Sequence, residues 1–384
     1  MRKTITIGDL GTIITGKTPP TTNKNYYGDY AVFIKPTDIS EQCKFTYETE
    51  EMYSKLAAEK YESSLIPKGA ICVPCIGTIG TKMTMAPCDC YTNQSINSIV
   101  CNENYDNEYV YYLIKNFLPG LKAYNLGTAS GREYVSKSNF EKIELVAEQD
   151  KTIQKKIGEF LSRYDSLIEN YQKQIKLLEE AAQRIYKEWF VDLRFPGHEN
   201  TKIVDGVPEG WEEKSISEVF DFKYGKILPT KDFVEDGPIP VYGASKQIGR
   251  YTKANCFEPK VLIGSRGNAG FVHRTIEDET YVTNNSFIVE PCAKYGYLKL
   301  PFIFESFKVL DFDAICTGAA QPQLTLNSIS SLKYIVPIKD LIVKYCGITT
   351  CYFNKIALAY KQIHLLTEAR DRLLPKLMSG EIEI

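Results

Sequence analysis

Two long segments of the chain carry an apolar residue at every seventh position. Two adjacent rows run through the first segment: Ile157, Tyr164, Tyr171, Leu178 and Ile185 in one, and Leu161, Ile168, Ile175, Ala182 and Trp189 in the other. A heptad repeat that persists over this length is typical of a coiled coil, because it presents one apolar seam to a partner helix. The pattern predicts a central helix over residues 149–192.

The second segment repeats this pattern with two exceptions. Its rows are Tyr345, Tyr352, Ala359, Leu366 and Leu373 in one, and Ile356, Ile363 and Leu377 in the other, interrupted by Thr349 and Arg370. They predict a helix over residues 339–380. At 1.5 Å per residue each helix is about 60 Å long, more than one small domain covers. We therefore expect the two helices to form an antiparallel coiled coil with pseudo-twofold symmetry.

Five sequence blocks occur twice in the same order. The pairs are residues 6–20 with 215–229, 71–80 with 261–270, 91–96 with 281–287, 127–146 with 318–337, and 174–184 with 362–372. The third pair aligns Asn93 with Asn284 and Ser95 with Ser286. Such repeats are typical of tandem domains. The predicted fold class is α+β, with two α/β, mostly β, domains at residues 1–148 and 205–338, each followed by a long helix.

The amino-acid composition excludes few classes of function. The net charge of −2 leaves nucleic-acid binding open, but it would require local basic patches. The eleven cysteines lie among apolar neighbours, which favours reduced thiols. No apolar run approaches 18 residues and no apolar signal region begins the sequence, so we expect a cytoplasmic protein without a membrane span.

The segment GTIITGKT, residues 11–18, matches the phosphate-loop pattern of nucleotide-binding proteins. Such a loop needs a buried strand before it and a helix after it, but Pro19 and Pro20 follow directly. In the second copy Phe220 replaces the first glycine and Ile227 replaces the threonine. Only the Gly-Lys turn is therefore repeated, and a nucleotide-hydrolysing enzyme remains an alternative carried by this segment alone.

The sequence indicates a zinc site only weakly and indicates no catalytic site. Four cysteines have tolerable spacing for zinc: Cys72, Cys75, Cys88 and Cys90. The second copy has Leu262 and Ser265 at the first two positions, so buried apolar thiols explain the pattern and no metal is expected. The three histidines are scattered and no nucleophile motif occurs. We expect the chain not to be an enzyme.

Both helix ends resemble a known family. The sequences QRIYKEWFVDLRFPG at residues 183–197 and LTEARDRLLPKLMSGEI at residues 366–382 resemble the repeated ends of type I restriction–modification specificity subunits. The opening IGDLGTIITGKTPP also resembles the usual domain start of that family. The resemblance extends over nearly the whole chain in the right order.

The resemblance implies a DNA-binding subunit. Two target recognition domains would each read one half of a split, asymmetric site on double-stranded DNA, and the helices would set the spacer and dock two methyltransferase subunits. Restriction subunits that translocate DNA would then join. S-adenosylmethionine, ATP and Mg²⁺ would be bound by these partners, and no cofactor by this chain. A related type IIB system and a coiled-coil scaffold without a DNA role are the alternatives.

Candidate DNA contacts follow from the repeat. Lys17 and Lys226 occupy the same turn in both copies, which suits phosphate contact or simply a solvated turn. Arg266, whose counterpart is Ile76, suits a bidentate guanine contact in one half-site. Adenine edges suit Asn93 and Asn284, unless these are structural turn residues. Further candidates are Arg132, Gln321 and Gln323 in the late loop, and Lys35, Lys82, Lys246 and Arg250 as looser surface cations.

The ends of the two helices carry large apolar side chains. These are Tyr186, Trp189 and Phe190 on the first helix, and Leu373, Leu374 and Leu377 on the second. They either dock a partner subunit or cap the adjacent domains, and the sequence leaves both interpretations open.

Overall fold

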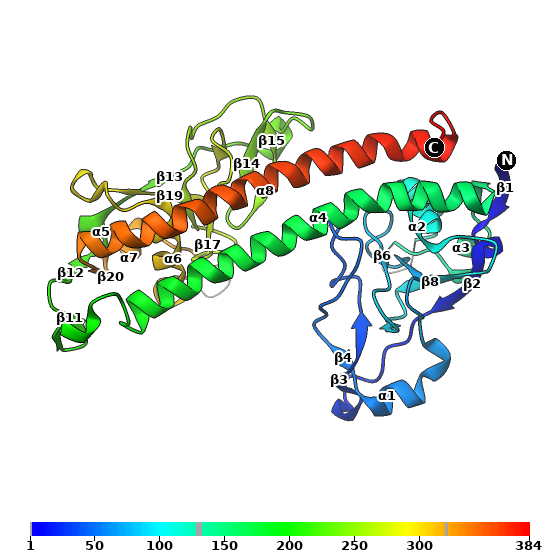
Figure 1. Ribbon diagram of the computed structural model, residues 1–384, viewed down its shortest axis with the longest axis horizontal. Helices are drawn as coiled ribbons and strands as arrows, with labels where there is room; N and C mark the ends of the chain where they lie inside the picture. The colour runs from blue at the N-terminus through cyan, green and yellow to red at the C-terminus, as the bar shows by residue number, and fades with distance from the viewer. Residues whose placement is uncertain (1, 128–132, 319–321) are drawn as a thin grey trace. The chain divides into compact units, whose positions relative to one another are not determined.

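The computed structural model describes residues 2–127, 133–318 and 322–384 of the chain (Figure 1). It divides into two compact units, and each long helix contributes to both. The first unit comprises Met1–Asn170 and Gln362–Ile384, and the second comprises Tyr171–Lys361.

The described residues of the first unit form three small sheets. In the largest, β2 (Gly11–Thr15), β8 (Ile96–Cys101), β5 (Ile71–Pro74) and β6 (Thr84–Met85) pair antiparallel in that order. Strand β3 (Tyr27–Ile34) lies between antiparallel β4 (Met52–Tyr53) and parallel β7 (Tyr91–Thr92). Strands β1 (Arg2–Thr6) and β9 (Glu144–Glu148) form an antiparallel pair. The short helices are α1 (Lys55–Lys60), α2 (Asn107–Phe117) and α3 (Lys137–Glu141).

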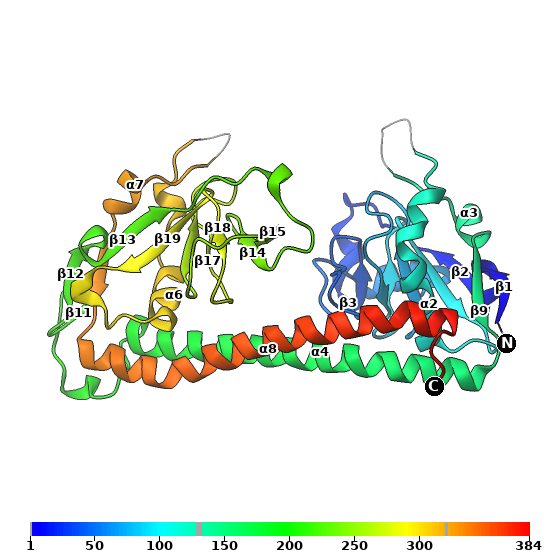
Figure 2. The same ribbon diagram turned by 90° about the horizontal axis from the view of Figure 1, so that it is seen from above.

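Helix α2 joins the sheet of the first unit to the long helices. Its N-cap residue Asp106 accepts a hydrogen bond from the Tyr109 N–H at 3.1 Å, which satisfies a backbone donor that the helix leaves free. Six successive residues of α2, from Tyr109 to Ile114, are buried. The same core contains Ile99 of β8 and Leu161 and Leu377 of the long helices. Figure 2 shows α2 beside the long helices.

The second unit repeats this plan with a different set of side chains. Strands β13 (Phe220–Tyr224), β19 (Ser286–Pro291), β16 (Val261–Gly264) and β17 (Val272–Arg274) form the antiparallel sheet. Strand β14 (Ile239–Tyr242) lies between antiparallel β15 (Gln247–Tyr251) and parallel β18 (Tyr281–Val282), and β12 (Glu212–Ser215) pairs with β20 (Lys333–Val336). This unit also contains the two-residue strands β10 (Ile203–Val204) and β11 (Val207–Pro208), and the α-helices α5 (Ile216–Val219), α6 (Leu300–Lys308) and α7 (Leu326–Ser330).

The hydrogen-bond ladders correct the predicted alignment of the two copies. Strands β8 and β19 pair with β5 and β16 at equivalent places when Ile96 is matched with Ser286. This match places Asn93 opposite Thr283, one residue away from the predicted Asn284. In the block that pairs residues 127–146 with 318–337, the Val135 N–H donates to the Cys75 carbonyl and the Leu324 N–H donates to the Ser265 carbonyl. Val135 therefore corresponds to Leu324, two residues before the position that the sequence blocks predict.

The repeated Gly-Lys turn exists because backbone passes close to backbone there. A Cβ atom on Gly16 would lie 2.1 Å from the Thr92 carbonyl oxygen, and one on Gly225 would lie 2.3 Å from that of Thr283. No side chain fits at such separations. The Lys17 N–H donates to the Thr92 carbonyl at 2.9 Å, and the Lys226 N–H donates to that of Val282 at 2.9 Å.

The same geometry removes the nucleotide-loop interpretation. Residues 11–15 of the motif are strand β2 itself, and no helix begins in the described residues that directly follow Lys17. The N–H groups of Gly16 and Lys17 donate to carbonyls of Ile96 and Thr92. They are therefore not available to cradle a phosphate, as a phosphate loop requires.

The long helices are α4 (Lys151–Tyr186), which continues as a π-helical turn over Lys187–Val191, and α8 (Lys339–Ser379). Within the first unit, the early part of α4 packs against the late part of α8, as Asp165 pairs with Arg370. Within the second unit, Tyr345 donates to the Ala182 carbonyl at 3.2 Å. The helices thus pair antiparallel in each unit, and the predicted class of sheet domains with long paired helices is confirmed.

Candidate nucleic-acid interface

A continuous set of contacts connects four predicted residues in the second unit. The Asn284 N–H donates to the Lys226 carbonyl at 3.2 Å, and the Asn284 carbonyl accepts from the Ser265 hydroxyl at 3.2 Å. The next residue, Arg266, forms an antiparallel bridge with Gln323. Lys226 and Arg266 are exposed, while Asn284 and Gln323 are half-buried. Neither Lys226 nor Arg266 makes a side-chain ion pair within the described residues, so both cations remain open to solvent.

The first unit builds the same edge from other residues. Lys17 is exposed, and its Nζ lies 3.5 Å from the Ser63 hydroxyl. Ile76 and Tyr134 form the bridge that corresponds to Arg266 and Gln323. Half-buried Lys82 follows the same loop. This edge therefore offers two lysines and an isoleucine–tyrosine pair, where the second unit offers a lysine, an arginine and an amide.

Three predicted contacts have structural partners instead. Lys35 lies 2.7 Å from Glu50 and 3.1 Å from Glu51. Burial lowers the pKa of Lys35, but the hydrogen bonds that its ammonium donates to both carboxylates outweigh this effect and raise that pKa. The Arg250 guanidinium donates to the carbonyls of Gly237 and Pro238, which fixes the loop before β14.

The Asn93 side chain is the third. Its Oδ1 accepts from the Ser95 N–H at 3.1 Å, which makes it a structural turn residue. Lys246 is exposed in the connection between β14 and β15, where it remains a surface cation. Two further predictions, Arg132 and Gln321, lie outside the described residues.

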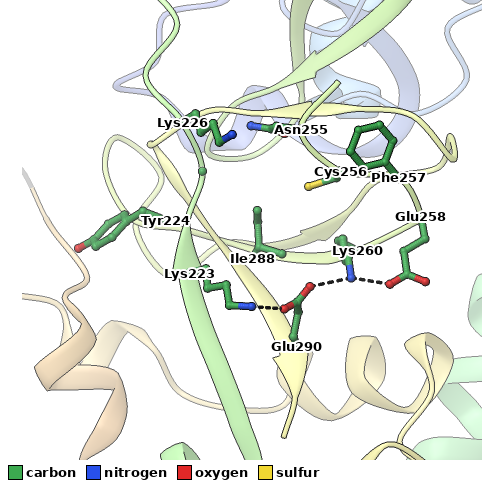
Figure 3. Close-up of a pocket in the computed structure, with 11 residues that line it drawn as sticks. Lys223, Tyr224, Lys226, Asn255, Cys256, Phe257, Glu258, Lys260, Ile288 and Glu290 are labelled. Atoms are coloured by element: carbon green, nitrogen blue, oxygen red, sulfur yellow. Dashed lines mark hydrogen bonds and ion pairs between the residues drawn. The ribbon is translucent and has the colours of Figure 1, made fainter. Parts of the chain in front are cut away.

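A pocket of about 450 Å³ opens beside the Lys226 turn (Figure 3). Its floor is a chain of ion pairs: Lys223 lies 2.6 Å from Glu290, which lies 2.8 Å from Lys260, which in turn lies 2.6 Å from Glu258. Those two lysines are therefore neutralised by carboxylates. Figure 3 shows Lys226 at the other end of the pocket, near Asn255, so it adds an open cation to the rim.

Sequence reasoning missed this pocket. By the strand ladders, Lys223 and Glu290 correspond to Ile14 and Val100 of the first unit, so no repeated motif marks them. Phe257, which lines the pocket and is 71% exposed, also went unnoticed. The exposure of Phe257 is set by the tertiary fold and cannot be read from the sequence. The one sequence feature that could have indicated the pocket is the presence of Lys223 and Lys226 in the same strand-turn segment.

The proposed docking residues are mostly core residues. Tyr186 and Phe190 pack with Phe302 and Tyr345 in the core of the second unit. Leu374 and Leu377 belong to the core of the first unit, and Trp189 and Leu373 are partly buried against the same cores. Four of the six side chains are therefore inaccessible to a partner, and the capping interpretation explains them.

The zinc interpretation finds no support in the described part of the chain. Burial raises the pKa of Cys72 to about 11 and that of Cys75 to about 12, so both thiols stay protonated. No group of three or more metal-binding side chains gathers in the described residues. Within those residues, no helix has both the length and the apolar character to cross a membrane.

Comparison with known proteins identifies the architecture. The MjaIX type I restriction enzyme specificity subunit of Methanocaldococcus jannaschii is 25% identical over 408 residues, which covers 98% of this chain and 93% of that protein. The HindI specificity subunit of Haemophilus influenzae is 37% identical over 158 residues, covering 39% of this chain and 33% of that protein.

A solved structure agrees in fold. The crystal structure of the type I restriction–modification S subunit from M. genitalium aligns with a TM-score of 0.59 at 20% identity, covering 98% of this chain and 96% of that one. The family described as "Type I restriction modification DNA specificity domain" matches residues 2–180 and 208–350, once for each copy of the repeat. Two copies of one fold, each with open cations on a corresponding edge, thus agree with the family match, and the chain belongs to the type I restriction–modification DNA specificity family.

Proposed function

We propose that this chain gives a type I restriction–modification complex its DNA sequence specificity. Each domain reads one half of a bipartite, asymmetric site on double-stranded DNA. The observation that carries this proposal is that both domains keep the same Gly-Lys turn and the same bridge, yet present different side chains there. Two related domains that recognise different half-sites need the same backbone arrangement and different side chains at the DNA-facing positions.

The residue types suggest which side chains contact phosphates and which contact bases. Lys17 and Lys226 supply phosphate contacts, which position a protein on DNA without reading its sequence. The bridge residues and the loops beside them face base edges. Because each lysine is fixed by a backbone hydrogen bond at the turn, the phosphate contact holds the nearby loop at a defined place along the groove.

The chemistry belongs to partner subunits in this proposal. The chain docks two methyltransferase subunits, which restriction subunits then join, and those partners bind S-adenosylmethionine, ATP and Mg²⁺. The relatives are named as specificity subunits of type I restriction enzymes, which supports a recognition role without catalysis. The helices α4 and α8 act as the spacer between half-sites.

Methylation mapping tests the proposal directly. The genome of the source cells is sequenced for modified bases with and without this gene. We expect one split motif, two unlike half-sites around a fixed spacer, to lose its methylation on deletion and regain it on complementation. A methylome unchanged by deletion, together with binding of the purified complex to all duplexes alike, contradicts it.

A further inference from the structure

We propose that one structural position decides which base each domain accepts: the bridge formed by Arg266 with Gln323 in the second domain and by Ile76 with Tyr134 in the first. This inference rests on the proposed function and deepens it. The two bridges are equivalent because Ser265 and Cys75 make the same neighbouring hydrogen bonds, to Asn285 at 2.7 Å and to Ser95 at 2.7 Å.

The bridge holds its two side chains together. Directly opposed residues of an antiparallel pair project to the same face, with Cβ atoms about 4.5–5.5 Å apart. The backbone around the pair in the second domain is tied on several sides. Gln323 exchanges hydrogen bonds with Thr317 at 2.8 and 2.9 Å, and Leu324 donates to the Ser265 carbonyl at 3.0 Å. The guanidinium and the amide are thus presented side by side from a fixed frame.

The loop that carries Arg266 is shaped by two glycines. Gly267 and Gly270 have φ values of +81° and +83°, and their counterparts Gly77 and Gly80 have +81° and +73°. These backbone angles favour glycine. Both domains therefore retain the same tight turn, and the residue before it varies between Arg266 and Ile76.

No structural role within the described residues explains an arginine at position 266. Its side chain makes no hydrogen bond or ion pair within the described residues, and the first domain forms the same bridge with an isoleucine in its place. Gln323 contributes backbone bonds to the fold, whereas its amide has no partner among the described residues. Both polar groups are free to meet an outside partner.

The residue chemistry predicts different bases for the two half-sites. A guanidinium fork matches the O6 and N7 acceptors of guanine, and a glutamine amide matches N6 and N7 of adenine. The second half-site should therefore require a guanine, with an adenine favoured beside it. The first domain offers apolar Ile76 at the same place, which suits the thymine methyl group and cannot discriminate guanine.

The decisive test compares three variants by methylation mapping in cells that express the whole complex. Arg266→Lys keeps the positive charge but loses the fork, so it separates base reading from phosphate contact. Arg266→Ala removes both, and Lys231→Ala removes an exposed lysine elsewhere in the second domain as the control. Tryptophan fluorescence checks folding, because both tryptophans, Trp189 and Trp211, pack on the second domain's core.

We expect both Arg266 variants to lose discrimination at one guanine of one half-site, by about ten- to a hundredfold, while the other half-site and the spacer stay the same. Lys231→Ala should leave the motif unaltered. The reciprocal change, Ile76→Arg, should alter only the opposite half-site.

The outcomes separate this inference from the proposed function. If Arg266→Ala, which removes every donor to the base, preserves the motif in full, Arg266 is not a base reader and the inference is overturned. The same holds if both half-sites change together. If the unmodified complex has no split motif, the proposed function itself fails, whatever the variants do.

Discussion

Lys17 and Lys35 lie in the same domain, but their surroundings give them different roles. Lys17 is exposed, and within the described residues only the Ser63 hydroxyl lies within hydrogen-bond distance of its amine. The Lys35 side chain is 19% exposed and is neutralised by two glutamates. Both were candidates from sequence alone, because residue type and loop position do not reveal an acidic partner 15 residues away. Burial and pairing therefore decide which predicted cations remain available.

This contrast makes a prediction about salt dependence. Lys17→Ala should weaken binding to all duplexes and lower the slope of log K against log salt by about 0.9, the value for one lost phosphate contact. Lys35→Ala should leave that slope unaltered. Binding of the complex measured over a salt series decides the matter, and equal slopes for Lys17→Ala and the parent would remove Lys17 from the interface.

His273 provides a second prediction at this scale. It is buried between the rings of Tyr242 and Phe271, and burial lowers its pKa to about 4. In the unfolded chain its pKa is about 6.5. Between these values the unfolded state binds a proton that the folded state does not, so stability falls as pH falls from about 6.5 towards 4.

The expected loss for the second unit is about 2 kcal/mol between pH 7.5 and pH 5.0. Urea unfolding followed by tryptophan fluorescence measures it, since Trp189 and Trp211 pack on the core of this unit. His273→Gln should remove this contribution to the pH dependence. A slope that is the same in parent and variant shows that His273 does not cause it.

At the scale of the element, the heptad rows predicted both long helices. They did not explain why two polar residues, Thr349 and Arg370, occupy positions in these apolar rows. Thr349 is buried because its hydroxyl donates to the Tyr345 carbonyl one turn earlier, at 2.9 Å. Arg370 is buried because it pairs with Asp165, which also accepts from the Tyr112 hydroxyl. That partner lies 205 residues away, so no local pattern records it.

The register of the loops in the two copies was also not predictable from the sequence. The repeat located the turn lysines, but matching Asn and Ser letters placed Asn93 opposite Asn284 instead of Thr283. Register is set by which carbonyl each N–H reaches, and side-chain letters in a short turn do not encode this. The pairing of Arg266 with Gln323 was missed for the same reason.

The buried charge pair between the helices yields a prediction of its own. Arg370→Met should destabilise the first unit by about 3–5 kcal/mol, because it leaves the Asp165 carboxylate buried without its ion-pair partner. The double variant Asp165→Leu with Arg370→Met should recover most of that loss. Hydrogen exchange in α2 and early α4 measures it, and additive losses in the double variant would show that the two residues are not coupled.

The glycine of the repeated turn predicts a contrast between two alanine variants. Gly225→Ala places a Cβ atom 2.3 Å from the Thr283 carbonyl oxygen and should destabilise the second unit by several kcal/mol, about 3 or more. Gly267→Ala meets no atom within 4 Å and costs only the strain of its φ of +81°, about 1–2 kcal/mol. Thermal unfolding followed by tryptophan fluorescence compares them, and equal losses contradict the close-approach explanation.

At the scale of the whole molecule, the chain passes from one compact unit to the other within α4 and returns within α8. The crossings fall at Asn170/Tyr171 and Lys361/Gln362, so an equal insertion at both leaves the packing inside each unit intact. If the helices set the spacer, seven added residues in each helix lengthen it by about 10.5 Å. We therefore expect a spacer longer by about 3 base pairs with unaltered half-sites, read by methylation mapping. An unaltered spacer argues against the helices as the ruler.

The return of the chain to its first unit also has a consequence for biosynthesis. Leu374, Leu377 and Met378 complete the core around the first sheet, and Arg2 donates to the carbonyls of Leu377 and Met378. On the ribosome, residues 171–361 have all been synthesised before these side chains are added. The domain translated first therefore reaches its finished fold last, and until then its apolar interior is left to whatever chaperones attend the nascent chain.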